Sequence, residues 1–184
     1  MAPDTSAEEY QTREERLEVA RRYRERRGRE LRELAQTAVD DGEVEAAGEF
    51  SAVPTEALAA VPGVGMLMLP FARRKARKLG LAPKLLLALD TEHLHALELR
   101  PTDMRRDHAD ASEILSWPRG EVSIERAGRA FMRDKVLLHV PDREEPIELF
   151  APSLTTNPWS AEVVRLLGGE APDPLDLSLE GPGA

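Results

Sequence analysis

Two histidines, His93 and His95, are the residues of this 184-residue sequence whose spacing most directly permits chemistry. They lie two positions apart in a predicted strand, so their side chains share one face. Such a pair can hold a transition metal when a third ligand arrives, and His108 or His139 could supply it. Nothing in the sequence places that third ligand nearby, and strand histidines are common without metal. The sequence therefore predicts no metal site.

Catalytic motifs are missing from the sequence. Asp103, Asp107, His108 and Asp110 could do acid–base chemistry if they were buried together, but carboxylates in a polar loop are more often solvated. No serine has the glycines of a nucleophile elbow, and Gly63–Val64–Gly65 lacks the dinucleotide-binding pattern. The sequence contains no cysteine, which excludes disulfides, thiolate zinc sites and cysteine nucleophiles. We therefore predict that the protein is not an enzyme and binds no cofactor.

The basic residues include one concentrated run. The formal net charge is −9, yet residues 71–84 contain six bases and no acid. An acidic chain of this kind is a poor nonspecific nucleic-acid binder, so no nucleic-acid partner is expected. The run follows an apolar stretch, 57–72. Two interpretations stay open: the two segments bind an anionic membrane surface, or the apolar side chains cover the protein core and the bases are solvated. The candidate anionic-surface residues are Arg73, Arg74, Lys75, Arg77 and Lys78.

Residues 6–40 are predicted to form a long charged helix, with Ser6 and Glu9 as a capping box. Apolar residues recur at heptad spacing, but Arg24 and Arg27 interrupt the seam and Gly28 weakens the helix centre. A weak coiled coil and a solvated helix held at its C-terminal third both remain open, and the second is favoured. A groove between this helix and the sheet is a further candidate surface. The predicted partner-binding residues are Arg22, Glu25, Arg26 and Arg29.

After Lys84 the pattern changes to short alternating segments typical of antiparallel strands. The predicted strands are 84–90, 93–100, 113–117, 122–126, 129–133, 135–140 and 146–151, with 43–52 as an extra strand. The segment 101–112 is predicted to be a loop, and Ala127–Gly128 a turn. A short helix is expected between Pro70 and Gly80. A second short helix is expected to begin at Asn157 and Pro158, to bury Trp159, and to end at Gly168 and Gly169.

The stretches LLLALDTEHLHAL and SWPRGEVSIER, followed by one amphipathic helix, resemble the small uncharacterised bacterial pleckstrin-homology-like domain proteins over residues 84–168. The resemblance implies a strongly bent sheet with an open end that the C-terminal helix plugs, with Trp159 and Leu166 as the plug. Lipid-binding members carry basic residues in the first hairpin loop. Here that loop reads Asp90–Thr91–Glu92, which is acidic, and this argues against lipid binding at the usual place.

The predicted fold class is α+β: a long N-terminal helix plus a small antiparallel β-barrel or sheet closed by a C-terminal helix. The expected segments are a charged helix (1–42), a linking strand and short helix (43–83), the β domain (84–168) and an acidic disordered tail (169–184). The expected function is a noncatalytic interaction or scaffolding module that binds a protein partner or itself, the alternative being peripheral membrane binding.

The expected location is the cytoplasm, because the N-terminal residues are polar throughout and no stretch of uninterrupted apolar residues is long enough to span a bilayer. Under the membrane-binding alternative, the protein would lie at the inner membrane face. Arginine outnumbers lysine 21 to 4. That ratio is typical of a GC-rich, bacterial genome and bears on codon usage rather than on function.

Overall fold

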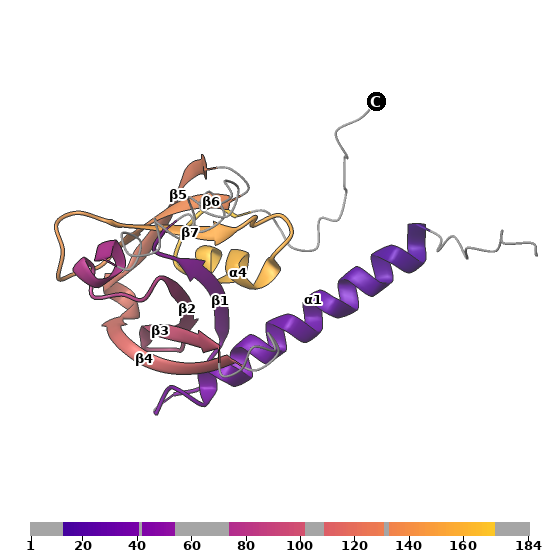
Figure 1. The fold of residues 1–184 in the computed structure, drawn as a ribbon, viewed down its shortest axis with the longest axis horizontal. Helices are drawn as coiled ribbons and strands as arrows, with labels where there is room; N and C mark the ends of the chain where they lie inside the picture. The colour runs from indigo at the N-terminus through magenta and orange to yellow at the C-terminus, as the bar shows by residue number, and fades with distance from the viewer. Residues whose placement is uncertain (1–12, 41, 54–73, 102–108, 131–132, 172–184) are drawn as a thin grey trace, which may run out of the picture.

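A computed structural model of the chain describes residues 13–40, 42–53, 74–101, 109–130 and 133–171. It is an α+β structure with one antiparallel sheet in the strand order β4-β3-β2-β1-β7-β6-β5 (Figure 1). The helices are α1 (Arg13–Gln36), the short 3-10 helix η1 (Arg119–Glu121) and α4 (Pro158–Leu166), and residues 74–78 are also helical. The strands are β1 (Ala46–Ser51), β2 (Lys84–Leu89), β3 (His93–Pro101), β4 (Ala109–Pro118), β5 (Ser123–Ala130), β6 (Arg133–His139) and β7 (Ile147–Pro152).

Strand β2 is buried on both faces, which explains why its sequence reads as an almost continuous apolar run. Leu85, Leu87 and Leu89 belong to one hydrophobic cluster, while Leu86 and Ala88 belong to a second cluster on the opposite face. The polar–apolar alternation of a half-exposed strand disappears when both faces are covered. The predicted hairpin between β2 and β3 is confirmed, with Leu89 opposite Leu94.

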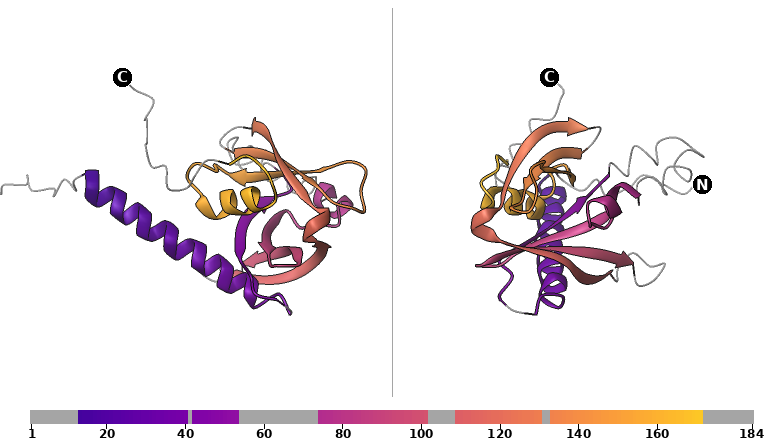
Figure 2. Two further views of the ribbon diagram at one scale, coloured as in Figure 1. Left: turned by 180° about the vertical axis from the view of Figure 1, so that it is seen from behind. Right: turned by 90° about the vertical axis from the view of Figure 1, so that its left-hand side faces the viewer.

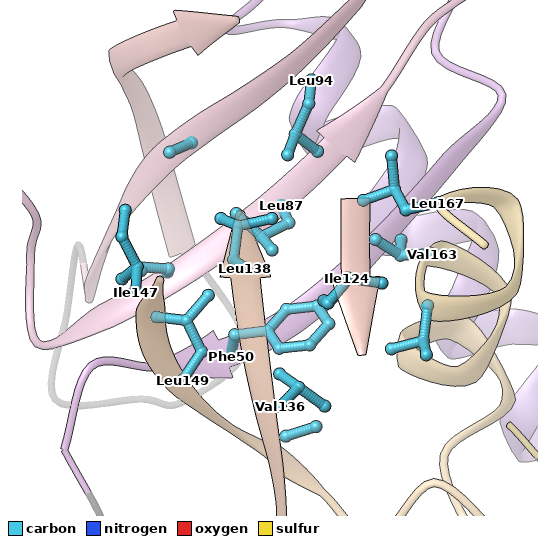
Figure 3. Packing of buried hydrophobic residues seen from close by; sticks show 14 of the residues in the cluster. Phe50, Leu87, Leu94, Ile124, Val136, Leu138, Ile147, Leu149, Val163 and Leu167 are labelled. Carbon is cyan, nitrogen blue, oxygen red and sulfur yellow. The ribbon is translucent and has the colours of Figure 1, made fainter. Parts of the chain in front are cut away.

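The segment expected as an extra strand lies in the middle of the sheet. Strand β1 pairs with β2 along its whole length but with β7 only at Ser51, which faces Phe150. The sheet consequently divides at β1 into two halves that diverge from each other (Figure 2). Between these halves lies the larger hydrophobic cluster, in which Phe50, Leu87 and Leu138 gather with their neighbours (Figure 3).

Helix α4 fills the space between the two halves, though not with both of the side chains expected to do so. Ala161, Val163 and Val164 are fully buried in the larger cluster and are joined there by Leu167 (Figure 3). Leu166 was predicted to be part of the plug, and this is wrong because it is 41% exposed. Helical periodicity defined the apolar stripe correctly, but Leu166 lies at its edge and turns to solvent.

Helix α1 is held by its C-terminal third, as the favoured interpretation predicted. Leu31 and Ala35 are fully buried in the second cluster, where they pack with Leu86, Leu97 and Trp159. Arg27 is also paired with Glu49 of β1 at 2.7 Å, and the N-terminal half of the helix stands away from the sheet (Figure 1). Its exposed faces carry pairs of opposite charge four residues apart, including Glu18–Arg22 at 2.9 Å.

The helix predicted to end at Gly80 does so. Gly80 has φ of 69°, and its N–H bonds to the carbonyl of Arg77, while the N–H of Leu81 bonds to the carbonyl of Ala76. This pair of hydrogen bonds is the Schellman arrangement, which favours glycine because the residue after the helix must adopt a left-handed conformation. The predicted start at Pro70 lies outside the described residues.

Three local predictions about the sheet need correction. Strand β4 begins at Ala109, so the C-terminal part of the predicted loop 101–112 is strand, paired with β3. Ala127–Gly128 is not a turn, because β5 continues through it with a register shift between Arg126 and Gly128. A glycine with φ of 111° permits such a β-bulge, which from sequence alone looks like a turn. The predicted barrel is not formed either, because the sheet is open between β4 and β5.

Among the described residues, no helix is both long enough and apolar enough to cross a membrane.

Candidate functional site

A groove of about 350 Å³ runs between α1 and α4. Helix α1 contributes one face of five residues to it, α4 contributes its outer side, and β1 contributes the floor. The lining residues are Arg21, Arg24, Glu25, Gly28, Arg32, Ala47, Pro158, Trp159, Glu162 and Arg165. The sequence analysis placed a candidate groove between the long helix and the sheet, whereas this groove lies between α1 and α4, with a residue of β1 in its lining.

Two small residues bring the walls of the groove together. A Cβ atom at Gly28 would lie 4.0 Å from Cβ of Trp159, so α1 passes close to the first turn of α4. At Gly48, in β1, a Cβ atom would lie only 2.8 Å from Cα of Ser160. Ser160 also donates its hydroxyl hydrogen bond to the carbonyl of Glu49 at 3.1 Å. Strand β1 therefore holds α4, and with it the groove, through direct backbone proximity.

The groove carries more positive than negative charge. Arg21 is neutralised by Glu25 at 3.1 Å, whereas Arg24, Arg32 and Arg165 form no ion pair with any other described residue. Glu162 is the remaining acid on the lining. The whole chain has a formal net charge of −9, whereas the lining of this groove contains four arginines and two glutamates. Guanidinium groups can bind carboxylates through two parallel hydrogen bonds, so the lining is suited to acidic groups.

Trp159 forms the inner end of the groove. Its ring is buried against Leu31 and Ala35, and its indole Nε1 has no hydrogen-bond partner in the described structure. Buried donors are usually satisfied. The side chain therefore acts here through its area of apolar contact with α1, which fixes the distance between the two helices.

Most of the predicted partner-binding residues lie outside the groove. Glu25 lines it, but Arg22 pairs with Glu18, Arg26 pairs with Glu30 at 3.4 Å, and Arg29 is exposed. The prediction followed the charge pairs along the helix rather than one face of it. Arg21, Arg24, Gly28 and Arg32 recur at spacings of three and four, and this periodicity could have identified the groove face.

The candidate anionic-surface residues are only partly described. Residues 57–72 and Arg73 lie outside the described part of the chain. Arg74, Lys75, Arg77 and Lys78 are exposed around the buried Ala76, and Lys75 lies 3.4 Å from Glu148. The short helix is thus anchored to the sheet through Ala76 while its basic side chains face solvent.

A second cluster of polar side chains lies at the turn between β2 and β3. His95 is 6% exposed and lies between two carboxylates: Nδ1 is 2.6 Å from Oε2 of Glu113, and Nε2 is 3.0 Å from Oδ2 of Asp90. Oδ1 of Asp90 accepts the backbone N–H of Glu92 at 2.7 Å and that of His93. Burial disfavours the charged form of Asp90, but these hydrogen bonds outweigh it and hold the pKa of Asp90 below its ordinary value.

The two histidines predicted to share one face of a strand lie close to a third possible metal ligand, Asp90, which the sequence analysis did not consider. Asp90, His93 and His95 each offer a ligand atom, and these atoms lie within 4.8 Å of one another. The third ligands considered from the sequence do not take this place: His139 is exposed 3.6 Å from Glu125, and His108 lies outside the described residues. Asp90 was assigned to a hairpin loop, and only the tight turn brings its carboxylate back to His95.

The loop acids considered for acid–base chemistry do not form a described site. Asp103, Asp107 and His108 lie outside the described residues, and Asp110 is exposed on β4, opposite Arg100.

No protein-family model matches the sequence, and no curated protein matches it.

Proposed function

We propose that this protein is a noncatalytic interaction module that binds an acidic segment of a partner protein in the groove between α1 and α4. The observation that carries the proposal is the excess of arginine there: Arg24, Arg32 and Arg165 line the groove without ionic partners among the described residues. Their positions on two helices place cationic groups along both walls. An extended chain bearing carboxylates at intervals would meet them in succession.

The construction of the groove supports this binding role. One wall, α1, is fastened to the sheet by Leu31 and Ala35, and the other, α4, is fastened by its apolar stripe. Both walls are therefore set before a ligand arrives, which lowers the entropy cost of binding. A groove of about 350 Å³ accommodates a few side chains of a peptide rather than a folded surface.

The fold is consistent with an interaction platform. A bent antiparallel sheet with a C-terminal helix packed between its halves supports the resemblance to pleckstrin-homology-like domains, and the open edge between β4 and β5 is a departure from it. The acidic turn Asp90–Thr91–Glu92 argues against the lipid site of that group. Because fold alone does not define function, the groove remains the basis of the proposal.

The test is a binding titration of the full chain with a fluorescent peptide that alternates aspartate or glutamate with leucine. Arg24→Glu and Arg165→Glu, which reverse charge on opposite walls, should each weaken binding about tenfold or more, as expected for loss of a charge-assisted hydrogen bond plus repulsion. Arg29→Glu is the matched control, because Arg29 lies on the same helix outside the groove. Binding should also weaken as salt is added.

Equal effects of all three charge reversals would contradict the groove and indicate a diffuse electrostatic attraction. Failure of the wild-type chain to bind the peptide at low salt would reject the acidic partner.

Vesicles rich in anionic lipid provide the comparison with the membrane alternative. If the chain sediments with them and Arg74→Glu with Arg77→Glu abolishes this, the exposed basic helix rather than the groove is the binding surface.

Self-association through α1 is a second candidate, supported by a separate observation. Val19 and Tyr23 lie one helical turn apart and are 59% and 53% exposed. Two apolar side chains at this spacing can meet the same pair on a second copy. Sedimentation equilibrium tests it: a dimer that Tyr23→Glu converts to monomer would support self-association, and a monomeric wild-type chain would reject it.

A further inference from the structure

His95 lies between two carboxylates, but a neutral imidazole ring has only one N–H group to donate to them. A neutral imidazole has one N–H donor and one lone pair, so it can donate to Glu113 or to Asp90 but not to both. Its Nδ1 is 2.6 Å from Glu113, and its Nε2 is 3.0 Å from Asp90. With Nδ1–H donating to Glu113, the lone pair of Nε2 faces the anionic Oδ2 of Asp90. That contact needs a positive group between the two atoms: a second ring proton or a metal ion.

We propose that Asp90, His93 and His95 bind a divalent transition-metal ion of the Zn²⁺ class, with Glu113 orienting His95 from behind. The ligand atoms of the three residues lie within 4.8 Å of one another. Metal–ligand bonds of about 2.0–2.2 Å place two ligands of a tetrahedral zinc site roughly 3.4 Å apart. The 3.0 Å between Asp90 Oδ2 and His95 Nε2 is therefore close to what the metal requires.

The surrounding structure holds each ligand in place. The backbone N–H groups of Glu92 and His93 fix one carboxylate oxygen of Asp90, so the other is directed at His95. Alternation along β3 puts His93 and His95 on the same face, with ring centroids 5.9 Å apart. At Gly42 a Cβ atom would lie 2.6 Å from Oδ2 of Asp90. Any larger residue there would therefore clash with the carboxylate in its present position.

Glu113 has the role that carboxylates commonly have around metal-bound histidines. A histidine that binds metal through one nitrogen usually donates its other N–H to a carboxylate or carbonyl, which sets the tautomer and the ring orientation. His95 meets this condition, because Glu113 accepts at Nδ1 and leaves Nε2 for the metal. Arg119 donates to the backbone carbonyl of Asp90 at 2.8 Å, and its guanidinium group is paired with Glu45 at 2.8 Å.

The ligand set limits the identity of the ion. Two imidazole nitrogens and one carboxylate oxygen suit Zn²⁺ and its transition-metal neighbours, whereas Mg²⁺ and Ca²⁺ prefer sites made of oxygen. His93 is half-buried, while Asp90 and His95 are buried, so the ion would approach from the side of His93. Three protein ligands leave a fourth tetrahedral position for water or an added ligand.

The experiment is a calorimetric titration of the full chain, without an added histidine tag, with Zn²⁺ alone. Co²⁺ is used in parallel, because tetrahedral coordination gives it an intense visible absorption. His93→Ala is the decisive variant: its ring makes no hydrogen bond to another described residue, so the Asp90–His95–Glu113 contacts survive its removal. Circular dichroism checks folding, and His93→Gln serves if the alanine variant unfolds.

Wild-type protein should bind one Zn²⁺, and His93→Ala should weaken this by at least tenfold. Glu113→Gln should weaken it by about 10–100-fold, the usual effect of removing an outer carboxylate partner. His139→Ala is the matched control and should bind as wild type does, because His139 is exposed near Glu125. Absence of Zn²⁺ binding by the wild-type chain would overturn the proposal. Unchanged binding by His93→Ala, or loss of binding in His108→Ala, would overturn it as well.

Discussion

Arg126 and Asp134 form a partly buried ion pair that joins β5 to β6. Nε and Nη2 of Arg126 both donate to Oδ1 of Asp134, at 3.0 and 2.5 Å, and Asp134 has no exposed surface. The other carboxylate oxygen accepts the N–H of Leu154 at 2.8 Å. One carboxylate thus ties two neighbouring strands to the segment that leads into α4, and through α4 it supports one wall of the groove.

Asp134→Asn should destabilise the fold. The amide can still accept one hydrogen bond, but the charge that balances Arg126 is lost, and hydrogen bonds to charged groups contribute about 1.5–3 kcal/mol each. We expect urea unfolding to show a loss of about 2 kcal/mol. Arg129→Gln is the comparison: Arg129 is 57% exposed and 3.5 Å from the same oxygen, so its loss should change little. Similar losses in both variants would contradict a special role for Arg126.

Gly48→Ala should also destabilise the protein, because β1 and α4 are packed backbone to backbone at this point. The new Cβ atom would lie 2.8 Å from Cα of Ser160 and 3.1 Å from the carbonyl oxygen of Trp159. Neither neighbour is a flexible side-chain end, so α4 must shift, and overpacking of this kind costs about 1–3 kcal/mol. Thermal unfolding measures it. Gly120→Ala is the control, since a Cβ there meets nothing within 4 Å. A stable Gly48→Ala variant would mean that α4 is held less tightly than the structure indicates.

Gly28→Ala should have the opposite effect. Gly28 lies inside α1, and the added Cβ would make only an ordinary contact, 4.0 Å from Cβ of Trp159. Alanine in place of glycine stabilises a helix interior by about 0.5–1 kcal/mol. Circular dichroism should show a modest rise in the unfolding midpoint. A fall in the midpoint would show that the approach of α1 to Trp159 leaves no room for a methyl group.

Asp90 should contribute to the acid sensitivity of the fold. Its pKa in the folded protein is lowered from 3.8, so the unfolded chain takes up the proton first. The stabilisation is therefore complete above 3.8 and is lost as the pH falls below it, through the folded pKa. Asp90→Asn retains an acceptor for the turn but cannot titrate, and urea unfolding should show a smaller loss of stability in this acid range.

These acid titrations are performed with a chelator, so that metal binding does not contribute to the result. Asp110→Asn, on an exposed part of β4, is the matched control and should keep the wild-type acid response. A wild-type acid response in Asp90→Asn would mean that Asp90 does not retain its charge through the hydrogen bonds at the turn.

Much of the secondary structure could be predicted from local pattern. The β2–β3 hairpin follows from two apolar runs around a polar turn, and α4 follows from Asn157, Pro158 and its apolar stripe. Even so, Asn157 makes no side-chain capping hydrogen bond; its Nδ2 donates to the carbonyl of Ser153 instead. The bulge at Gly128 and the first residues of β4 were missed, because a glycine or a polar stretch reads as a turn or loop unless its pairing partner is known.

The candidate sites were harder to predict, because each joins residues far apart in the sequence. Arg24 and Arg165 are 141 positions apart and face one groove only because α1 and α4 pack against β1. Glu113 reaches His95 through the pairing of β3 with β4, in which the register shifts after Ala96. The pattern of apolar and polar residues within one helix or strand cannot predict a contact between side chains of two different elements.

The amino-acid sequence by itself determined the β2–β3 hairpin, helix α4, the end of the short helix at Gly80, and the charge that α1 presents to solvent. These properties depend on local periodicity, turn residues and caps, which act over a few positions. The tertiary structure alone decided that β1 lies at the centre of the sheet, that Gly48 lets β1 pack directly against α4, and that Asp90 faces His95. Those relationships depend on long-range packing, where the burial of two distant apolar faces fixes which polar groups must meet.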